Sequence, residues 1–147
     1  FLLTANIVSC GYQLRGDQEI NFNSITISGG STGFTKALKK KFKQSGLEID
    51  TSEAEKSLEI VNDNFTKKIL SLSSEGRVKE YEITYRVSYR VKLKGDIWSP
   101  IIAIEANRDF TFDDKNIIAK TEEESRLIKG MRNQLIRTIV TQISVSK

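Results

Sequence analysis

The sequence predicts an α+β fold in which two helices cover one face of a mixed, four-stranded sheet, with the element order β-α-β-β-β-α. Residues 81–93 alternate between apolar and polar side chains, and three further segments have the composition of strands. Two other segments carry apolar residues at the spacing of a helix. Because a sheet with one apolar face needs a covering layer, we expect both helices on that face, as a two-layer sandwich.

The first strand and the first helix are expected at residues 24–28 and between residues 31 and 46. Gly29 and Gly30 end the strand, and Ser31 or Thr32 can cap the helix by accepting a bond from a first-turn amide. Gly46 is a plausible stop signal at the other end. The apolar face of this helix comprises Phe34, Ala37, Leu38 and Phe42.

A run of lysines lies on the outward face of the same predicted helix: Lys39, Lys40, Lys41 and Lys43. One interpretation is a solvated face whose cations favour the C-terminal end of the helix dipole. The other is an anion-binding surface. The sequence leaves both open.

The second strand is expected at residues 57–74, with a bulge or twist near residues 62–64, because its apolar residues change face there. Residues 73–76 then form a hairpin turn, in which Gly76 supplies a positive φ. The third strand runs antiparallel from Val78, and its alternation predicts seven buried side chains: Tyr81, Ile83, Tyr85, Val87, Tyr89, Val91 and Leu93.

The last strand and the last helix complete the order. Residues 102–112 alternate as a strand, and only Arg108 interrupts their apolar face. Residues 121–124, T-E-E-E, match a capping box and predict the start of a helix of about 20 residues. Its apolar face comprises Leu127, Ile128, Met131, Leu135, Ile139 and Ile143.

Composition and motifs argue against catalysis. The 147 residues are 38% hydrophobic, which fits one domain, and the chain has no histidine and one cysteine. No phosphate loop, nucleophile elbow or zinc motif occurs, so we expect neither enzyme activity nor a cofactor or metal. The net charge of +4 favours anionic partners. Nucleic acid is not expected, because Tyr81, Tyr85 and Tyr89 share a face with core residues rather than forming a stacking surface.

The N-terminal stretch has the composition of a secretion signal. Residues 1–9 are expected to be the remainder of a signal peptide, and Ile7-Val8-Ser9-Cys10 resembles a bacterial lipobox. In that interpretation, Cys10 is lipidated and several acyl chains hold the protein on a membrane. The alternative is a buried structural cysteine.

The polar face of the central strand offers a second candidate surface. Arg86 and Arg90 alternate in sign with neighbours such as Glu105. Ordinary cross-strand pairing would explain this pattern. A sheet face that docks inside the polar, water-filled lumen of a barrel would explain it equally well, with Arg86, Arg90 and Glu105 as docking residues.

Three motifs together resemble the LptE (RlpB) family of lipopolysaccharide-assembly lipoproteins. They are C-G-Y-Q-L-R-G from Cys10, E-G-x-x-x-E-Y-x-I from Glu75, and a closing helix after Ala119-Lys120. The resemblance runs from Cys10 to about Ile143 and implies a single LptE-like domain over residues 10–147. It also implies a lipid-anchored protein on the periplasmic face of the outer membrane. Such a protein plugs the LptD barrel, helps that barrel assemble, and assists the insertion of lipopolysaccharide into the outer leaflet.

The resemblance further implies that basic residues near the hairpin tip and at the start of the last helix bind lipopolysaccharide. Lys120 matches the second position. At the tip, Ser74 and Glu75 stand where the family pattern has a cation, so Arg77 and Lys79 are the nearest candidates. The competing hypothesis is a free periplasm-facing lipoprotein that acts as a scaffold or binds an anionic glycolipid without a barrel partner.

Overall fold

The computed structural model describes residues 20–145 of the chain. The predicted signal remnant at residues 1–9 and the predicted lipidation site Cys10 lie outside this range. The elements follow one another as β1 (Ser24–Gly29), α1 (Thr32–Gln44), β2 (Glu48–Ile49), β3 (Lys56–Leu72), β4 (Val78–Leu93), β5 (Ile102–Thr111), a 3-10 turn (Asp114–Asn116) and α2 (Ile117–Val145).

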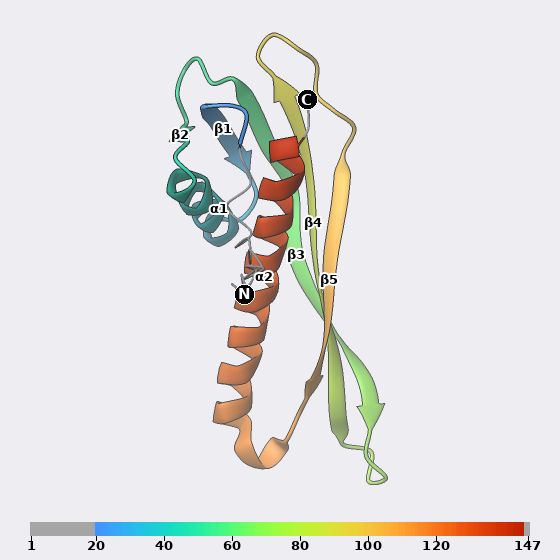
Figure 1. Ribbon diagram of the computed structural model, residues 1–147. Coiled ribbons are helices and arrows are strands. Elements are labelled where there is room, and N and C mark those ends of the chain that lie inside the picture. The colour runs from blue at the N-terminus through green and yellow to red at the C-terminus, as the bar shows by residue number, and fades with distance from the viewer. Residues whose placement is uncertain (1–19, 146–147) are drawn as a thin grey trace, which may run out of the picture.

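The sheet has five strands in the order β2-β1-β3-β4-β5, and both helices lie against one of its faces (Figure 1). The predicted α+β sandwich is therefore confirmed, while the expected number of four strands is wrong by one. The additional strand, β2, has two residues and pairs in parallel with β1. A segment this short has no measurable periodicity, so only its tertiary pairing identifies it as a strand.

The first helix begins and ends as expected. Ser31 is its N-cap, and the hydroxyl oxygen of Ser31 accepts a hydrogen bond from the Phe34 amide at 3.4 Å. Just after the helix, Gly46 has a φ of +85°, which a glycine adopts without strain. Phe34, Leu38 and Phe42 are fully buried. Local sequence thus determines the bounds of α1, and burial holds it on the sheet.

The predicted irregularity in the second strand is present, one residue earlier than expected. Pairing between β3 and β4 shifts register between Ile60 and Asn62, which leaves Val61 as the extra residue of a bulge. The bulge brings Phe65 onto the same face as Ile60, because these residues oppose Tyr85 and Tyr89 of β4.

The buried face of β4 is shorter than predicted. Ile83, Tyr85, Val87 and Tyr89 are buried, whereas Tyr81 and Val91 are half-buried. Leu93 is 40% exposed, so its prediction as a core residue is wrong. The strand is longer than the layer that covers it, and alternation cannot reveal where that cover ends.

The last helix starts earlier than its apparent capping box. It begins at Ile117, directly after the 3-10 turn, and spans 29 residues. The hydroxyl of Thr121 donates to the Ile117 carbonyl at 2.9 Å, as a threonine inside a helix does, so Thr121 is not a cap. Instead, the Asp113 carboxylate caps the preceding turn by accepting from the Lys115 amide at 3.0 Å. No helix within residues 20–145 is both long and apolar enough to cross a membrane.

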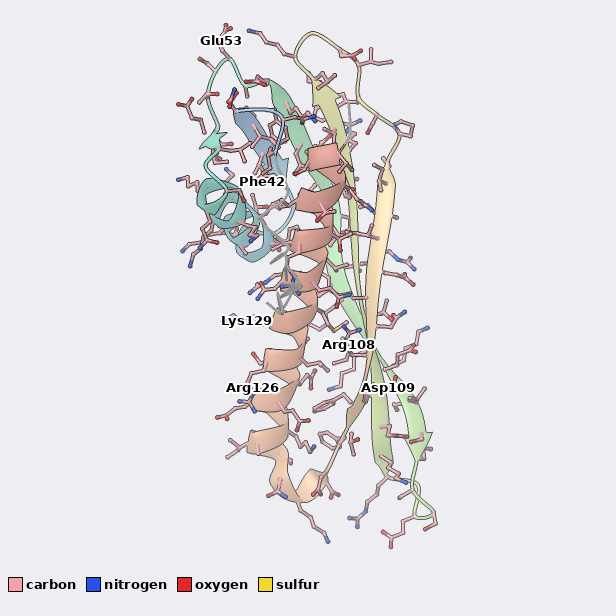
Figure 2. The ribbon with its side chains drawn as sticks, in the orientation of Figure 1. Phe42, Glu53, Arg108, Asp109, Arg126 and Lys129 are labelled. Atoms are coloured by element: carbon pink, nitrogen blue, oxygen red, sulfur yellow. The ribbon has the colours of Figure 1, made fainter. Side chains whose placement is uncertain are left out.

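One core joins the sheet to both helices. Met131, Leu135 and Ile139 of α2 are at most 2% exposed and pack in the same cluster as Phe34 of α1 and Val87 of β4. Arg126 and Lys129 lie on the side of α2 away from β5 (Figure 2). The helix therefore has the expected apolar and polar faces.

Candidate functional site

The hairpin turn and the beginning of α2 lie at the same end of the molecule (Figure 1). The turn is closed by backbone bonds between Ser73 and Arg77, at 2.8 Å, and from Gly76 to Ser73, at 2.9 Å. Arg77 donates to the Asp114 carboxylate at 3.1 Å, which connects the turn to the segment preceding α2. The structure thus brings together two segments that the resemblance implicated separately.

The three predicted cations at this end have different surroundings. The Arg77 side chain is 64% exposed, although it contacts both Asp114 and Glu75. Lys79 is exposed, and its carbonyl accepts a bond from the Phe112 amide at 2.9 Å. Lys120 is more enclosed: its ammonium lies 2.9 Å from the Glu123 carboxylate and 5.5 Å from the centre of the Phe110 ring. The side chain of Lys120 is only 21% exposed.

The sequence prediction missed a fourth cation near Lys120. The Lys67 ammonium lies 2.7 Å from the Glu124 carboxylate and 4.2 Å from the centre of the Tyr81 ring. It is also 5.8 Å from the Phe110 ring, which Lys120 approaches as well. Lys67 opposes Ile83 in the sheet, so it lies on the helix-covered face. A lysine between Phe65 and Ile69 was a possible signal, but only the bulge reveals which face it occupies.

The predicted docking residues form ion pairs within the sheet. Arg86 opposes Glu105 in register, and two of its nitrogens lie 2.7 and 3.0 Å from the same carboxylate oxygen. Arg90 opposes Glu59 of β3 and pairs with its carboxylate. The hydrogen bond from Arg86 lowers the pKa of Glu105, as does the charge of Arg86. Ordinary cross-strand pairing therefore accounts for the alternating charges, and the docking role remains a prediction.

The face of the sheet opposite the helices carries a polar cleft of about 380 Å³. Side chains from three neighbouring strands line it: Asn64, Thr66, Lys68, Glu82, Thr84, Arg86, Glu105 and Asn107. Amides, hydroxyls and both signs of charge offer donors and acceptors without an apolar patch. Such a surface suits a hydrated contact more than a dry one.

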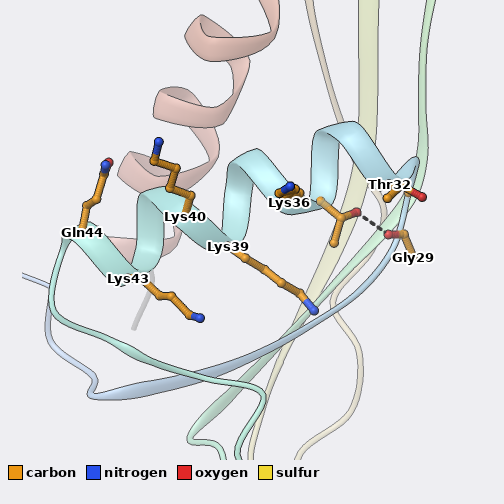
Figure 3. A pocket seen from close by; sticks show the side chains of 9 residues that line it. Gly29, Thr32, Lys36, Lys39, Lys40, Lys43 and Gln44 are labelled. Atoms are coloured by element: carbon orange, nitrogen blue, oxygen red, sulfur yellow. Dashed lines mark hydrogen bonds between the residues drawn. The ribbon is translucent and has the colours of Figure 1, made fainter.

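The lysine run of α1 borders a larger open cleft of about 940 Å³ (Figure 3). Lys36, Lys39, Lys40 and Lys43 repeat along one side of the helix, and the Lys39 ammonium lies 2.5 Å from the Asp50 carboxylate. The Thr35 hydroxyl donates to the Gly29 carbonyl at 2.7 Å at the other end of the cleft. The arrangement fits both interpretations of the lysine run. Within residues 20–145, no group of three or more acidic or cysteine side chains is arranged to hold a metal.

Most of the chain is similar to known proteins. A family model described as LptE, lipopolysaccharide-assembly, matches residues 20–143. LPS-assembly lipoprotein LptE from Pectobacterium atrosepticum is 23% identical over 149 residues, which span 97% of this chain and 79% of that protein. The region matched by the family model includes every described helix and strand except the last residues of α2.

Solved structures of lipoproteins are also similar to this chain. The crystal structure of rare lipoprotein B from Shewanella oneidensis is similar with a TM-score of 0.73 and 26% identity, over 82% of this chain and 93% of that one. The solution structure of lipoprotein B from Nitrosomonas europaea has a TM-score of 0.78 and 30% identity, over 91% and 90%. A minor lipoprotein from Acinetobacter baumannii, at 15% identity and a TM-score of 0.69 over 86% and 93%, has the same fold.

Proposed function

The chain belongs to the LptE family of lipopolysaccharide-assembly proteins, and we propose that it is a non-enzymatic outer-membrane lipoprotein that plugs the LptD barrel. In this role it helps the barrel assemble and assists the insertion of lipopolysaccharide into the outer leaflet. Cys10 carries the lipid anchor and holds the domain on the periplasmic face. The family match over residues 20–143 is the observation that carries the proposal.

The proposed lipopolysaccharide contact is the end of the molecule formed by the hairpin turn and the start of α2. Arg77 and Lys120 come from these two segments, and Arg77 contacts Asp114 of the second segment at 3.1 Å. Guanidinium and ammonium groups suit phosphates, the first by bidentate bonds and the second as a compact charge. The exposed Lys79 lies on the strand that leaves the turn and adds a third positive charge.

A phosphate at this end competes with carboxylates for the cations. Arg77 is engaged by Asp114 and Glu75, and Lys120 by Glu123. The two Arg77 pairs are exposed enough to contribute little to stability, so a phosphate can replace their carboxylates at small cost. The proposal therefore predicts binding that weakens as ionic strength rises.

The proposed barrel contact is the polar sheet face, with Arg86, Arg90 and Glu105 as its charged residues. Each of these residues has a partner of opposite charge in the sheet, so the face is nearly neutral over the docking area. A neutral, hydrogen-bonding face matches a polar lumen wall through many bridged contacts rather than a few strong ones.

The lipopolysaccharide contact is tested by charge reversal at Arg77, Lys79 and Lys120 together. Three lysines of α1, Lys39, Lys40 and Lys43, provide a matched control with the same change in net charge on another element. We expect the first triple variant to lose lipopolysaccharide binding in a filter or surface assay, while the control retains it. Loss of binding by the control alone would instead assign the contact to the lysine run of α1. Equal binding by both variants, with unchanged circular dichroism, would show that the assigned residues are wrong.

The barrel partnership is tested by mild-detergent purification of the lipidated full-length chain from its native envelope. We expect one large barrel protein at equal stoichiometry. Recovery of the chain alone, or only with periplasmic proteins, would favour the competing role as a free scaffold or glycolipid-binding lipoprotein.

A further inference from the structure

Strand β3 changes from a central strand to an edge strand halfway along its length. Its first part, up to Ile60, is paired with β1 on one side and β4 on the other, and β1 leaves the sheet at Gly29. From Val61 to Leu72, β4 is the only neighbour among the described strands. Exposure follows the same boundary: Leu58 and Ile60 are buried, whereas ten of the twelve residues after Ile60 are exposed. One side of the backbone is therefore unpaired over this stretch.

The unpaired stretch contains a regularly paired segment. Residues 62–69 pair one-to-one with residues 81–88 of β4, and register shifts flank them on both sides. Eight residues of strand extend over about 26 Å, which is enough to pair with a short strand. Main-chain donors and acceptors along such an edge bond readily to an added strand.

The usual protections of an edge strand are weak in this segment. Phe65 and Ile69 are 48% and 58% exposed on its helix-covered side. The charge of Lys67 is drawn toward α2 by Glu124, and Asp63 accepts bonds from the amide and hydroxyl of Ser31. Neither charge therefore projects from the edge, and Lys68, the third charge of the segment, lines the cleft on the opposite face of the sheet. Charges that do project from an edge are a common means of preventing strand addition.

The opposite edge of the sheet, β5, differs in this respect. Arg108 interrupts its apolar face, and the Arg108 guanidinium donates to the Gln134 side chain and to the Asn107 carbonyl. Asp109 adds an exposed charge to the same strand, and Pro100 precedes it. Arg108, like Lys67 of β3, is drawn toward α2, so the difference lies in Pro100, since a proline disfavours strand pairing. The two edges are thus unequal.

A groove beside the β3 edge defines the chemistry of its occupant. It has a volume of about 430 Å³ and lies between Phe65 and one side of α2. The buried Nε of Arg132 has no hydrogen-bond partner within residues 20–145, and Lys129 adds a second positive charge. The only acid of the groove, Glu124, is bound to Lys67. The positive charges of Arg132 and Lys129 would attract an acidic side chain from outside, and an apolar side chain would cover Phe65.

We propose that residues 62–69 of β3 pair with an extended segment of the barrel partner, which adds a strand to the sheet and directs an acidic side chain toward Arg132. This inference rests on the proposed function, since the barrel is the partner it requires. The added segment occupies, along the exposed half of β3, the position that β1 occupies along the buried half. Because the main-chain groups of β3 are unpaired, the occupant should be an extended polypeptide. Because the groove is positively charged, that polypeptide should carry an acidic residue.

The first test is amide hydrogen exchange on the purified complex of the lipidated chain with its barrel, compared with the free chain at two concentrations. Amides alternate sides along a strand, so we expect every second amide of residues 62–69 to exchange at least about tenfold more slowly in the complex. Amides of α1, which belongs to neither proposed contact, serve as the internal control and should not change. Unchanged exchange along β3 would overturn the inference, as would protection that depends on the concentration of the free chain, because a second copy would then be the occupant.

The second test uses two residues of equal exposure. Ile69, 58% exposed on the β3 edge, and Ile101, 59% exposed just before β5, are each replaced by Asp. We expect Ile69→Asp to reduce barrel recovery at least about tenfold and Ile101→Asp to leave it unchanged, because a charge on the edge blocks strand pairing. Absence of the barrel even with the unaltered chain would overturn the proposed function. Recovery of the barrel that is insensitive to Ile69→Asp would overturn this inference alone.

Discussion

Gly29 is the position at which a single methyl group should disrupt the fold most. It ends β1 opposite Ile60 and has a φ of +74°. A Cβ added there would lie 2.2 Å from the Ile60 carbonyl oxygen, about 1 Å closer than the shortest ordinary carbon–oxygen contact of roughly 3.3 Å. The obstacle is backbone of the central strand, which cannot rotate away, so β1 and β3 would have to separate locally.

Gly76 provides the matched control for Gly29→Ala. It has a nearly equal φ of +78°, and a Cβ at this position would meet no atom within 4 Å. Gly76→Ala should therefore cost only the backbone preference, about 1 to 2 kcal/mol. Gly29→Ala adds the clash to the same backbone cost, and we expect a total loss of about 3 to 5 kcal/mol.

The measurement is urea denaturation of both variants, followed by circular dichroism. The free energy of unfolding of Gly29→Ala should be lower than that of Gly76→Ala by roughly 2 kcal/mol or more, with similar m-values. Equal losses would refute the argument, because they would mean that β1 can shift from β3 at no cost.

Three further predictions concern single side chains. Burial, together with the negative charge of Asp63, raises the pKa of Tyr85 to about 12 from an ordinary 10.0, so the folded chain keeps a proton that the unfolded chain loses. Stability should therefore fall as pH rises from 10 to 12, and Tyr85→Phe should remove at most about 2 to 3 kcal/mol of that fall in urea titrations across this range. Ser31→Ala should destabilise the chain by about 1 kcal/mol in the same assay, through loss of the α1 cap. Ile139→Ala, at a fully buried site, should cost about 2 to 5 kcal/mol and lower the melting temperature.

Features that depend on neighbours along the chain could be predicted from the sequence. The face of β4 follows from strict alternation, and the bounds of α1 follow from Ser31 and Gly46. The bulge in β3 was predicted because its apolar residues change face, and the structure has it at Val61. In each case, a period or a cap is a property of a few consecutive residues.

Features that depend on contacts between distant segments could not be predicted in the same way. Thr121 has the sequence of a cap, but the helix had already begun at Ile117 because the preceding turn is capped by Asp113. The pairing of Lys67 with Glu124 requires the bulge, the strand register and the placement of α2 together. The candidate cations at the hairpin end were named from the family pattern, and the contact between Arg77 and Asp114 appears only in three dimensions.

The β3–β4 ribbon has a consequence for the order in which the chain folds. Its two strands are joined by a tight turn, so pairing can begin next to Gly76 and extend outward with little loss of chain entropy. Pairing of β1 with β3 is slower by comparison, because α1 and β2 lie between these strands in the sequence. The hairpin end should therefore form first and the crossover end last. A newly folding chain would then present its unpaired β3 edge before β1 has paired with the other half of that edge.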